Sequence, residues 1–275
     1  MSGTARDKDL IHEAPWVRFL GAPLEVHESL DSTNDEAFRR ALEGAPEGLV
    51  VLAGHQTSGK GRLGRTWLDK PGRSLMFSIL LKPLIPLQSY PLLSLGLAWS
   101  AAWTARTRQA RSIGYDRRLA GEVAIKWPND VFHRGRKLCG VLAESRALRP
   151  GESPILVLGV GMNVNYREED FPEEIRARAT SLCIATGEDH IKMSWVYRAM
   201  LYWFDQVLRI AYEGGLGFLL TVLQSELPEP GSRVRVALAD RAVEGELLEL
   251  TETGALRVRD EATGATETLT AGVME

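Results

Sequence analysis

The stretch Gly54–Trp67, GHQTSGKGRLGRTW, decides how the first half of this chain is read, because its first seven residues match the start of a phosphate-binding P-loop, G-x-x-x-x-G-K. A P-loop also needs a Ser or Thr after the Lys and a helix that opens there, but Gly61 stands at that position. Gly61 and Gly64 would each destabilise a helix by about 1 kcal/mol. We therefore predict a loop here and exclude a P-loop.

This loop still has the chemistry of an anion site. Glycines let backbone N–H groups approach an anion closely, and cations neutralise its charge. The alternative is a mobile basic surface loop without function, and Trp67 argues against it because an aromatic ring can stack on a base or cap a pocket. The glycines and cations concerned are Gly54, Gly59, Gly61, Gly64, Lys60, Arg62 and Arg65.

Outward from the loop, the hydrophobic pattern predicts a mixed α/β domain. A helix is expected over 31–46, with Thr33 and Glu36 as a capping box and Gly44 with Pro46 as the stop. A largely buried helix follows over 91–108, and a long amphipathic one runs from 193 to about 214. The expected strands cover 48–56, 74–83, 122–132, 136–148 and 154–165. Within 122–132, Pro128 is expected to end the strand, and Asn129 and Asp130 supply turn chemistry.

The pattern changes at Pro228–Gly231, PEPG, after which short alternating runs are separated by turn signals. Several short strands at this spacing are typical of a small β-barrel. We therefore predict two domains, 1–227 and 228–275.

Composition limits the class of protein. The 275 residues carry a net charge of -3, which gives no bulk attraction to nucleic acid or acidic lipid. Cys139 and Cys183 make no C-x-x-C spacing, so neither a metal nor a redox motif is expected. The polar start lacks the apolar stretch of a signal peptide, and no apolar run could span a bilayer. Cytoplasm is the default expectation, without membrane association.

Lys126 raises a question that the sequence leaves open. It lies between Ile125 and Trp127 in an otherwise apolar strand, where an ammonium is costly without an anionic partner. In an alternating strand, however, it would simply point to solvent. The strand sequence supports the two interpretations about equally.

Two other motifs each have a structural explanation beside a functional one. Gly159 and Gly161 interrupt a strand pattern, which indicates either close approach of a ligand or another backbone, or a structural bulge. Ser32 and Thr33 are fully explained as a helix cap. None of these motifs identifies a function alone.

Their combination resembles the biotin–protein ligases. The match runs in register from Asp31 to Asn165, and the small C-terminal module fits that family's second domain. The motifs that carry the resemblance are DSTN, GHQTSGKGRLGRTW, IKWPND, RKLCGVLAE and LGVGMNVN.

The resemblance implies an α+β fold: a mixed sheet with flanking helices, like class II aminoacyl-tRNA synthetases, and a small C-terminal SH3-like β-barrel. It also implies a two-step reaction. Biotin's carboxylate attacks the α-phosphate of MgATP to give biotinyl-5′-AMP and pyrophosphate. A lysine amine of a biotin carboxyl carrier domain, part of a biotin-dependent carboxylase, then takes the biotin. Deleting everything after Pro228 is expected to impair this transfer more than the fold.

The resemblance assigns roles to individual residues. Lys126 and Arg62 are the implied catalytic cations. In the first step the negatively charged carboxylate of biotin attacks the negatively charged polyphosphate of ATP, and cations offset the repulsion between them. No protein ligand for a metal is assigned, and Mg²⁺ is expected with ATP. The implied biotin-binding residues are Ser32, Thr33, Asn34, Gln56, Gly59, Lys60, Gly61, Arg62, Lys126 and Gly159. The implied nucleotide-binding residues are Lys60, Arg62, Arg65, Trp67, Lys126 and Asn163.

Three departures from the family pattern stand out. Lys60 replaces a common Arg, which keeps the charge but loses bidentate geometry. Met76 replaces a common aromatic residue and can pack on biotin. Too few residues precede Ser32 for the helix-turn-helix domain of some members, so we expect a monofunctional ligase without sequence-specific DNA binding. Several members dimerise through a sheet edge, so a homodimer is compatible with the resemblance.

Three rival functions remain. A lipoate ligase or octanoyltransferase belongs to the same superfamily, but its G-G-G-x-x-x-H type signature is missing. A biotin-sensing repressor or a nucleotide-binding protein without transfer would not need Lys126 and Arg62 together. An RNA-binding protein is disfavoured by the acidic balance of the chain.

Overall fold

The structure is a computed structural model that describes residues 17–20, 23–113 and 122–274. A seven-stranded mixed sheet forms its centre, in the order β1-β2-β3-β7-β6-β5-β4. Only the β1–β2 pair is parallel within it. The strands are β1 (Leu24–His27), β2 (Val50–Ala53), β3 (Ser74–Leu81), β4 (Val123–Lys126), β5 (Asp130–His133), β6 (Arg136–Arg146) and β7 (Ile155–Asn163).

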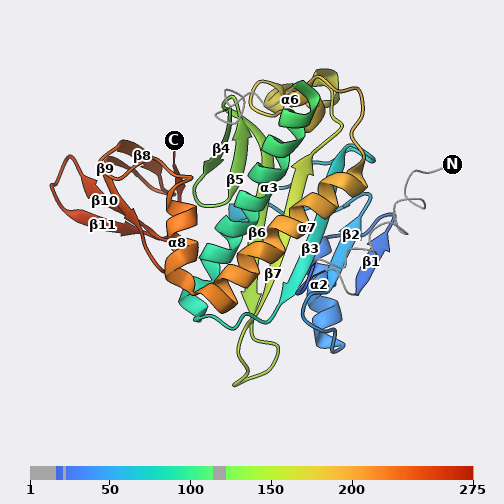
Figure 1. Cartoon of the computed structure of the whole chain (residues 1–275), viewed down its shortest axis with the longest axis horizontal. Helices are drawn as coiled ribbons and strands as arrows, with labels where there is room; N and C mark the ends of the chain where they lie inside the picture. Colours follow the sequence, from blue (N-terminus) through green and yellow to red (C-terminus); the bar gives the residue numbers. More distant parts are fainter. Residues whose placement is uncertain (1–16, 21–22, 114–121, 275) are drawn as a thin grey trace.

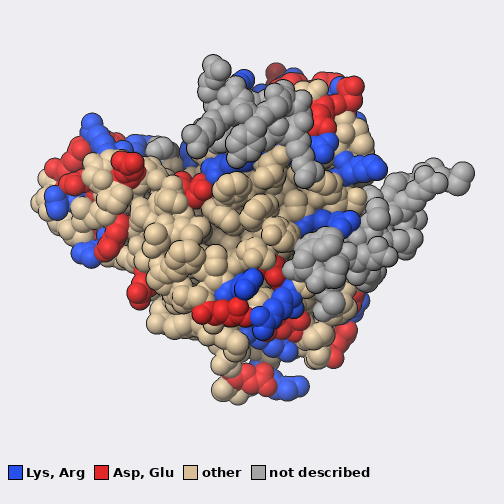
Figure 2. All heavy atoms as spheres, viewed as in Figure 1, with Lys and Arg blue, Asp and Glu red and all other residues tan. Residues whose placement is uncertain are grey.

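Two long helices, α3 (Tyr90–Ile113) and α7 (Met193–Arg209), cover one face of this sheet side by side (Figure 1). The middle of their outer surface carries few charges, which gather around its edge and on the C-terminal module (Figure 2). Within the described ranges, none of the helices combines the length and apolar character that crossing a bilayer requires. The shorter helical elements are α2 (Thr33–Leu42), η1 (Arg62–Gly64), η2 (Leu87–Ser89), η3 (Glu168–Asp170), α5 (Glu173–Arg176), α6 (Leu182–Thr186), η4 (Ile210–Gly214) and α8 (Leu216–Gln224).

Strand β3 shows how the pattern of period two sorts side chains between the two faces. Phe77 packs edge-to-face against Tyr197 of α7, with ring centroids 5.3 Å apart. Leu80 belongs instead to the apolar cluster that includes Phe38 of α2. Met76 shares the parity of Leu80, so it faces the α2 side of the sheet. That side holds the candidate site.

The C-terminal module is a five-stranded antiparallel sheet in the order β11-β10-β9-β8-β12, joined to the first domain through α8 (Figure 1). Its buried side chains belong to the same apolar cluster as those under α3 and α7. The predicted α+β fold with a small C-terminal SH3-like β domain is confirmed. The strands are β8 (Arg233–Ala237), β9 (Ala242–Leu250), β10 (Leu256–Asp260), β11 (Thr266–Leu269) and β12 (Val273–Met274).

Several local predictions need correction. The segment 122–132, counted as one strand candidate, holds the hairpin β4–β5. Strand β4 ends before Pro128 and the chain turns between Lys126 and Asp130, where a turn was predicted. The predicted capping box is wrong: Ser32 is the N-cap of α2 and makes no side-chain capping bond. No bulge interrupts β7, which pairs in continuous register with β3 and β6.

Candidate active site

A cavity of about 920 Å³ lies between the glycine-rich loop and the α2 side of the sheet. The N-terminus of α2 and Gln56 form one end, and the loop from Lys60 to Lys70 lies along it. The segment between Tyr166 and Ala179 lines the other end. Val273 of the C-terminal module also reaches the cavity. Segments far apart in sequence thus share one elongated space.

Glycines make room for the side chains that enter this cavity. A Cβ on Gly159 would lie 2.2 Å from Oδ1 of Asn34, and a Cβ on Gly161 would lie 2.4 Å from the ring of Trp67. Both distances are too short for any residue larger than glycine. The bulge explanation fails, and the groups that approach these two glycines are side chains of the protein, which neither predicted explanation included.

The α2 end of the cavity is a hydrogen-bonded polar network. The backbone N–H and the hydroxyl of Thr33 donate to Oε1 of Gln56 at 2.8 and 3.1 Å. Oγ of Ser78 lies 2.7 Å from the Thr33 hydroxyl and 2.6 Å from Oδ1 of Asn34. Nδ2 of Asn34 donates to Glu144 at 2.8 Å. These partners fix which amide and hydroxyl atoms can meet a ligand.

Sequence reasoning missed Ser78 and Glu144. Ser78 is fully buried in the otherwise apolar β3, SLMFSILL, and a buried hydroxyl there needs a polar partner. That requirement was a usable signal. Glu144 gave none, because it lies in an alternating strand with charged neighbours. Ser32 and Thr33, to which the resemblance gives a biotin-binding role, both line the cavity, and Ser32 is also the N-cap residue of α2.

The structure does not bring Lys126 to the cavity. Its ammonium lies over the ring of Phe132, 4.6 Å from the centroid, and its side chain is not part of the cavity lining. Val123 and Ile125 are buried while Lys126 is half-buried, as the alternating interpretation predicts.

Lys137 occupies the cavity instead. Its Nζ donates to Oδ2 of Asp130 at 2.8 Å, and both side chains line the space. A Cβ on Gly140 would lie 3.2 Å from Nζ of Lys137. Glycine at this position therefore leaves room for the lysine. The sequence could not separate Lys137 from Arg136, which bonds Glu168 instead.

The glycine-rich loop folds as a hairpin closed by backbone hydrogen bonds. Trp67 N–H donates to the carbonyl of Gly59 at 2.9 Å, and Gly61 N–H donates to that of Arg65 at 2.7 Å. Lys60 Nζ bonds Oδ1 of Asp35 at 2.6 Å, which holds the loop against α2. Arg65 is exposed at the cavity edge.

Arg62 crosses from the loop to two other parts of the molecule. Its Nη1 donates to Oδ1 of Asn129 at 3.1 Å and to the carbonyl of Gly272 at 3.3 Å. Burial lowers the pKa of the Arg62 guanidinium, and the negative charge of Asp130 opposes that shift. Removal from water strengthens the attraction of this guanidinium for an anion.

The far end of the cavity is partly aromatic. The rings of Tyr166 and Phe171 stack at 4.5 Å between centroids. Asp170 is paired with Lys70 at 2.5 Å, and this bond holds the pKa of the carboxyl below its usual range. Asn163 lines the cavity but gives its Nδ2 to the carbonyl of Thr180 at 3.0 Å.

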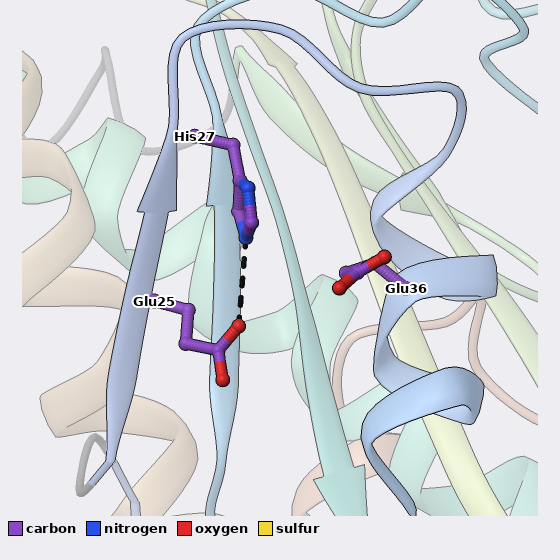
Figure 3. Close-up of side chains that lie close together, drawn as sticks. All are labelled: Glu25, His27 and Glu36. Carbon is purple, nitrogen blue, oxygen red and sulfur yellow. Dashed lines mark ion pairs between the residues drawn. The ribbon is translucent and has the colours of Figure 1, made fainter.

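One cluster outside the cavity has the composition of a metal site. Glu25 and His27 of β1 and Glu36 of α2 place ligand atoms within 4.8 Å of one another (Figure 3). Arg40, however, bonds Glu25 at 2.8 Å and Glu36 at 2.8 Å, while Arg39 bonds Glu36 at 2.6 Å. Arginines therefore already neutralise both carboxylates.

Comparison with known proteins gives a consistent result. The sequence profile described as Biotin/lipoate A/B protein ligase family matches residues 26–163. The bifunctional ligase/repressor BirA of Bacillus subtilis (strain 168) is 33% identical over 237 residues, which is 86% of this chain and 69% of that protein. The biotin--[acetyl-CoA-carboxylase] ligase of Mycobacterium tuberculosis is 37% identical over 161 residues, covering 58% and 54%.

Solved structures agree. The biotin protein ligase from Aquifex aeolicus in complex with biotin and ATP superposes with a TM-score of 0.69 at 29% identity, covering 92% of this chain and 97% of that one. Both the sheet and the C-terminal module fall within this coverage.

Proposed function

The chain belongs to the biotin/lipoate A/B protein ligase family, and from this premise we propose that it is a biotin–protein ligase. It forms biotinyl-5′-AMP and pyrophosphate from biotin and MgATP. It then transfers biotin to a lysine of the biotin carboxyl carrier domain of a biotin-dependent carboxylase. The observation that carries the proposal is the single cavity that joins a polar network, a cationic middle and an aromatic end.

The polar network suits biotin's ureido ring, whose carbonyl and two N–H groups need fixed partners. Ser32, Thr33, Asn34 and Gln56 supply hydroxyl and amide groups there. Their internal bonds with Ser78 orient these groups before the ligand binds. Gly159 leaves room for Asn34 against the sheet. Gly61 lines the same cavity and is assigned to the valeryl chain, whereas Gly59 lines a neighbouring pocket.

The cationic middle suits the attack of a carboxylate on a polyphosphate. Positive groups must offset the repulsion of the two anions and stabilise the charge of the transition state. Lys137 and Arg62 lie at the cavity, so we assign them this role, and Lys126 becomes a peripheral cation. Lys60 and Arg65 add charge at the loop.

The aromatic end suits the nucleotide. Trp67, Tyr166 and Phe171 offer ring faces to adenine, and Asn163 borders the same space. Mg²⁺ enters with ATP as part of the substrate. The names of the relatives from M. tuberculosis and Paracoccus denitrificans, both biotin--[acetyl-CoA-carboxylase] ligases, support a carboxylase carrier as the acceptor.

The test is biotin-dependent ATP–pyrophosphate exchange, run beside the same assay with lipoate and with octanoate. We expect exchange with biotin alone. Exchange with lipoate would move the protein to the sister activity of its family. Absence of exchange with all three acids would overturn the proposal.

A second assay follows the acceptor. A purified carboxyl carrier domain is expected to gain one biotinyl group, and its Lys→Arg variant none.

Two predictions made from the sequence stay predictions. The absence of a helix-turn-helix domain falls on residues 1–16, which lie outside the described residues. The homodimer remains a prediction for a sedimentation experiment.

A further inference from the structure

A buried carboxylate next to the cavity has no role in the chemistry above. The side chain of Asp69 is only 2% exposed. Its Oδ2 lies 2.9 Å from Nδ1 of His55, and its Oδ1 accepts the backbone N–H of Gln56 at 3.4 Å. A carboxylate is costly to bury without such partners. These two contacts are therefore what permits an aspartate at this position.

The contacts lie at the base of the glycine-rich hairpin. His55 comes just after β2, and Asp69 precedes β3, so the pair joins the two ends of the loop. The arm after His55 has its own anchor, because Thr57 N–H donates to the carbonyl of Leu30 at 2.9 Å. The second arm of the hairpin, which carries Asp69, begins directly after Trp67. Asp69 therefore links this second arm to the anchored first arm.

We propose that Asp69 and His55 are positioning residues that fasten the base of the hairpin and hold Gln56 and Trp67 in place before ligands bind. The consequence for biotin binding rests on the proposed function. Gln56 accepts two hydrogen bonds from Thr33, so a displaced Gln56 backbone would disturb the polar network. Trp67 lies two residues from Asp69, against Gly161.

A proton-transfer role for the pair does not fit the geometry. Asp69 lines the cavity, but the His55 side chain does not. A base would need to reach the atom from which it takes a proton. The pair therefore acts on the loop and not on the reacting atoms.

The experiment compares Asp69→Ala, Asp69→Asn and a matched control, Asp205→Ala. Asp205 is also a buried aspartate, 2% exposed, and it accepts the backbone N–H groups of Arg18 and Phe19. It lies on α7, on the opposite face of the sheet from the cavity. Two readouts are used: amide hydrogen exchange of residues 56–68 in the ligand-free protein, and KM for biotin against kcat.

Asp69→Ala is expected to speed exchange at the hydrogen-bonded Trp67 amide about tenfold and to raise KM for biotin by a similar factor, with a smaller change in kcat. Asp69→Asn, which keeps the hydrogen-bonding shape, should restore most of both. Asp205→Ala should lower the melting temperature and leave both readouts unchanged.

Unchanged loop exchange in a folded Asp69→Ala would overturn the proposal. So would equal effects in Asp69→Ala and Asp205→Ala, because they would indicate general destabilisation. Amide hydrogen exchange of the loop is measured without substrate and does not depend on the proposed function. Failure of the proposed function would appear instead as a wild-type protein that is inactive with biotin.

Discussion

At the scale of single residues, Lys126 and Lys137 differ in what surrounds their ammonium groups. Lys126 lies over the face of Phe132, whereas Lys137 is bonded to Asp130 beside the cavity. Lys126 stands between Ile125 and Trp127, whereas Lys137 follows Arg136 at the start of its strand, so nothing local marks Lys137 as the lysine at the cavity. The position of each side chain depends on the β4–β5 turn and on how β5 pairs with β6, where the register shifts.

Lys137→Gln should therefore lower biotin-dependent ATP–pyrophosphate exchange by about a hundredfold, the effect of losing one preorganised electrostatic group in the transition state. Lys126→Gln is the matched control, and it should change the rate far less. Circular dichroism checks that both variants fold. A larger loss in Lys126→Gln than in Lys137→Gln would restore Lys126 as the principal cation.

The Glu25–His27–Glu36 cluster gives a second prediction at this scale (Figure 3). Two carboxylates and an imidazole suit Zn²⁺, but Arg40 bridges both carboxylates. The wild-type protein should therefore bind no stoichiometric Zn²⁺ here. Arg40→Ala should create a binding site, visible by equilibrium dialysis.

Arg39→Ala is the control for this cluster, because it leaves the bridge of Arg40 intact. That variant should bind as little Zn²⁺ as the wild type. Stoichiometric Zn²⁺ in the wild-type protein, lost in Glu25→Gln, would show that the arginines give way to the metal.

At the scale of elements, the short strand β12 connects the C-terminal module to the active-site loop. Gly272, just before it, accepts a hydrogen bond from Arg62, and Met274 N–H donates to the carbonyl of Trp127 at 3.2 Å. The loop is thus held from three sides: by Asn129, by the C-terminal module and, through Lys60, by α2.

Arg62→Ala should speed the loss of bound biotinyl-5′-AMP about tenfold, because a charged hydrogen-bond donor is removed from both the ligand and the loop's anchors. The measurement is the dissociation rate of the preformed adenylate. Arg241→Ala, which breaks an ion pair with Glu267 in the C-terminal sheet, should leave this rate unchanged. An unaltered rate in Arg62→Ala would show that Arg62 does not retain the adenylate.

At the scale of the whole molecule, period and turn signals are local, so the sequence predicted the helices α2, α3 and α7 and the strands β2, β3, β6 and β7. Strand β1 and helices α6 and α8 were not predicted. The alternating runs after Pro228 predicted the C-terminal β module, whereas the resemblance implied the α+β class and the SH3-like form of that module. Within 122–132, Pro128 predicted the end of a strand and Asn129 with Asp130 predicted a turn, but the pairing of β5 back onto β4 was not predicted. Which side chains meet in the cavity also stayed hidden, since β6 and the loop meet only in three dimensions.

The two predicted domains, 1–227 and 228–275, share more structure than their sequence boundary indicates. Trp127 is 1% exposed, and its Nε1 donates to the carbonyl of Gly254 in the C-terminal module at 2.9 Å. Apolar residues of both parts belong to one buried cluster. The sequence suggested that removing the module would impair transfer more than the fold. These contacts argue that the fold suffers as well.

The full chain should therefore unfold in one cooperative transition, and residues 1–227 alone should melt about 10 °C lower. Exposing the Trp127 side chain and its hydrogen bond costs about 3 kcal/mol, and each kcal/mol shifts the melting temperature of a chain this size by about 2–4 °C. Calorimetry of both chains measures this. Trp127→Phe in the full chain removes this hydrogen bond together with part of the buried ring, and should lower the melting temperature less than deletion of the module does. Two separate transitions, with 1–227 melting as it does in the full chain, would show that the domains fold independently and that β12 affects only the loop.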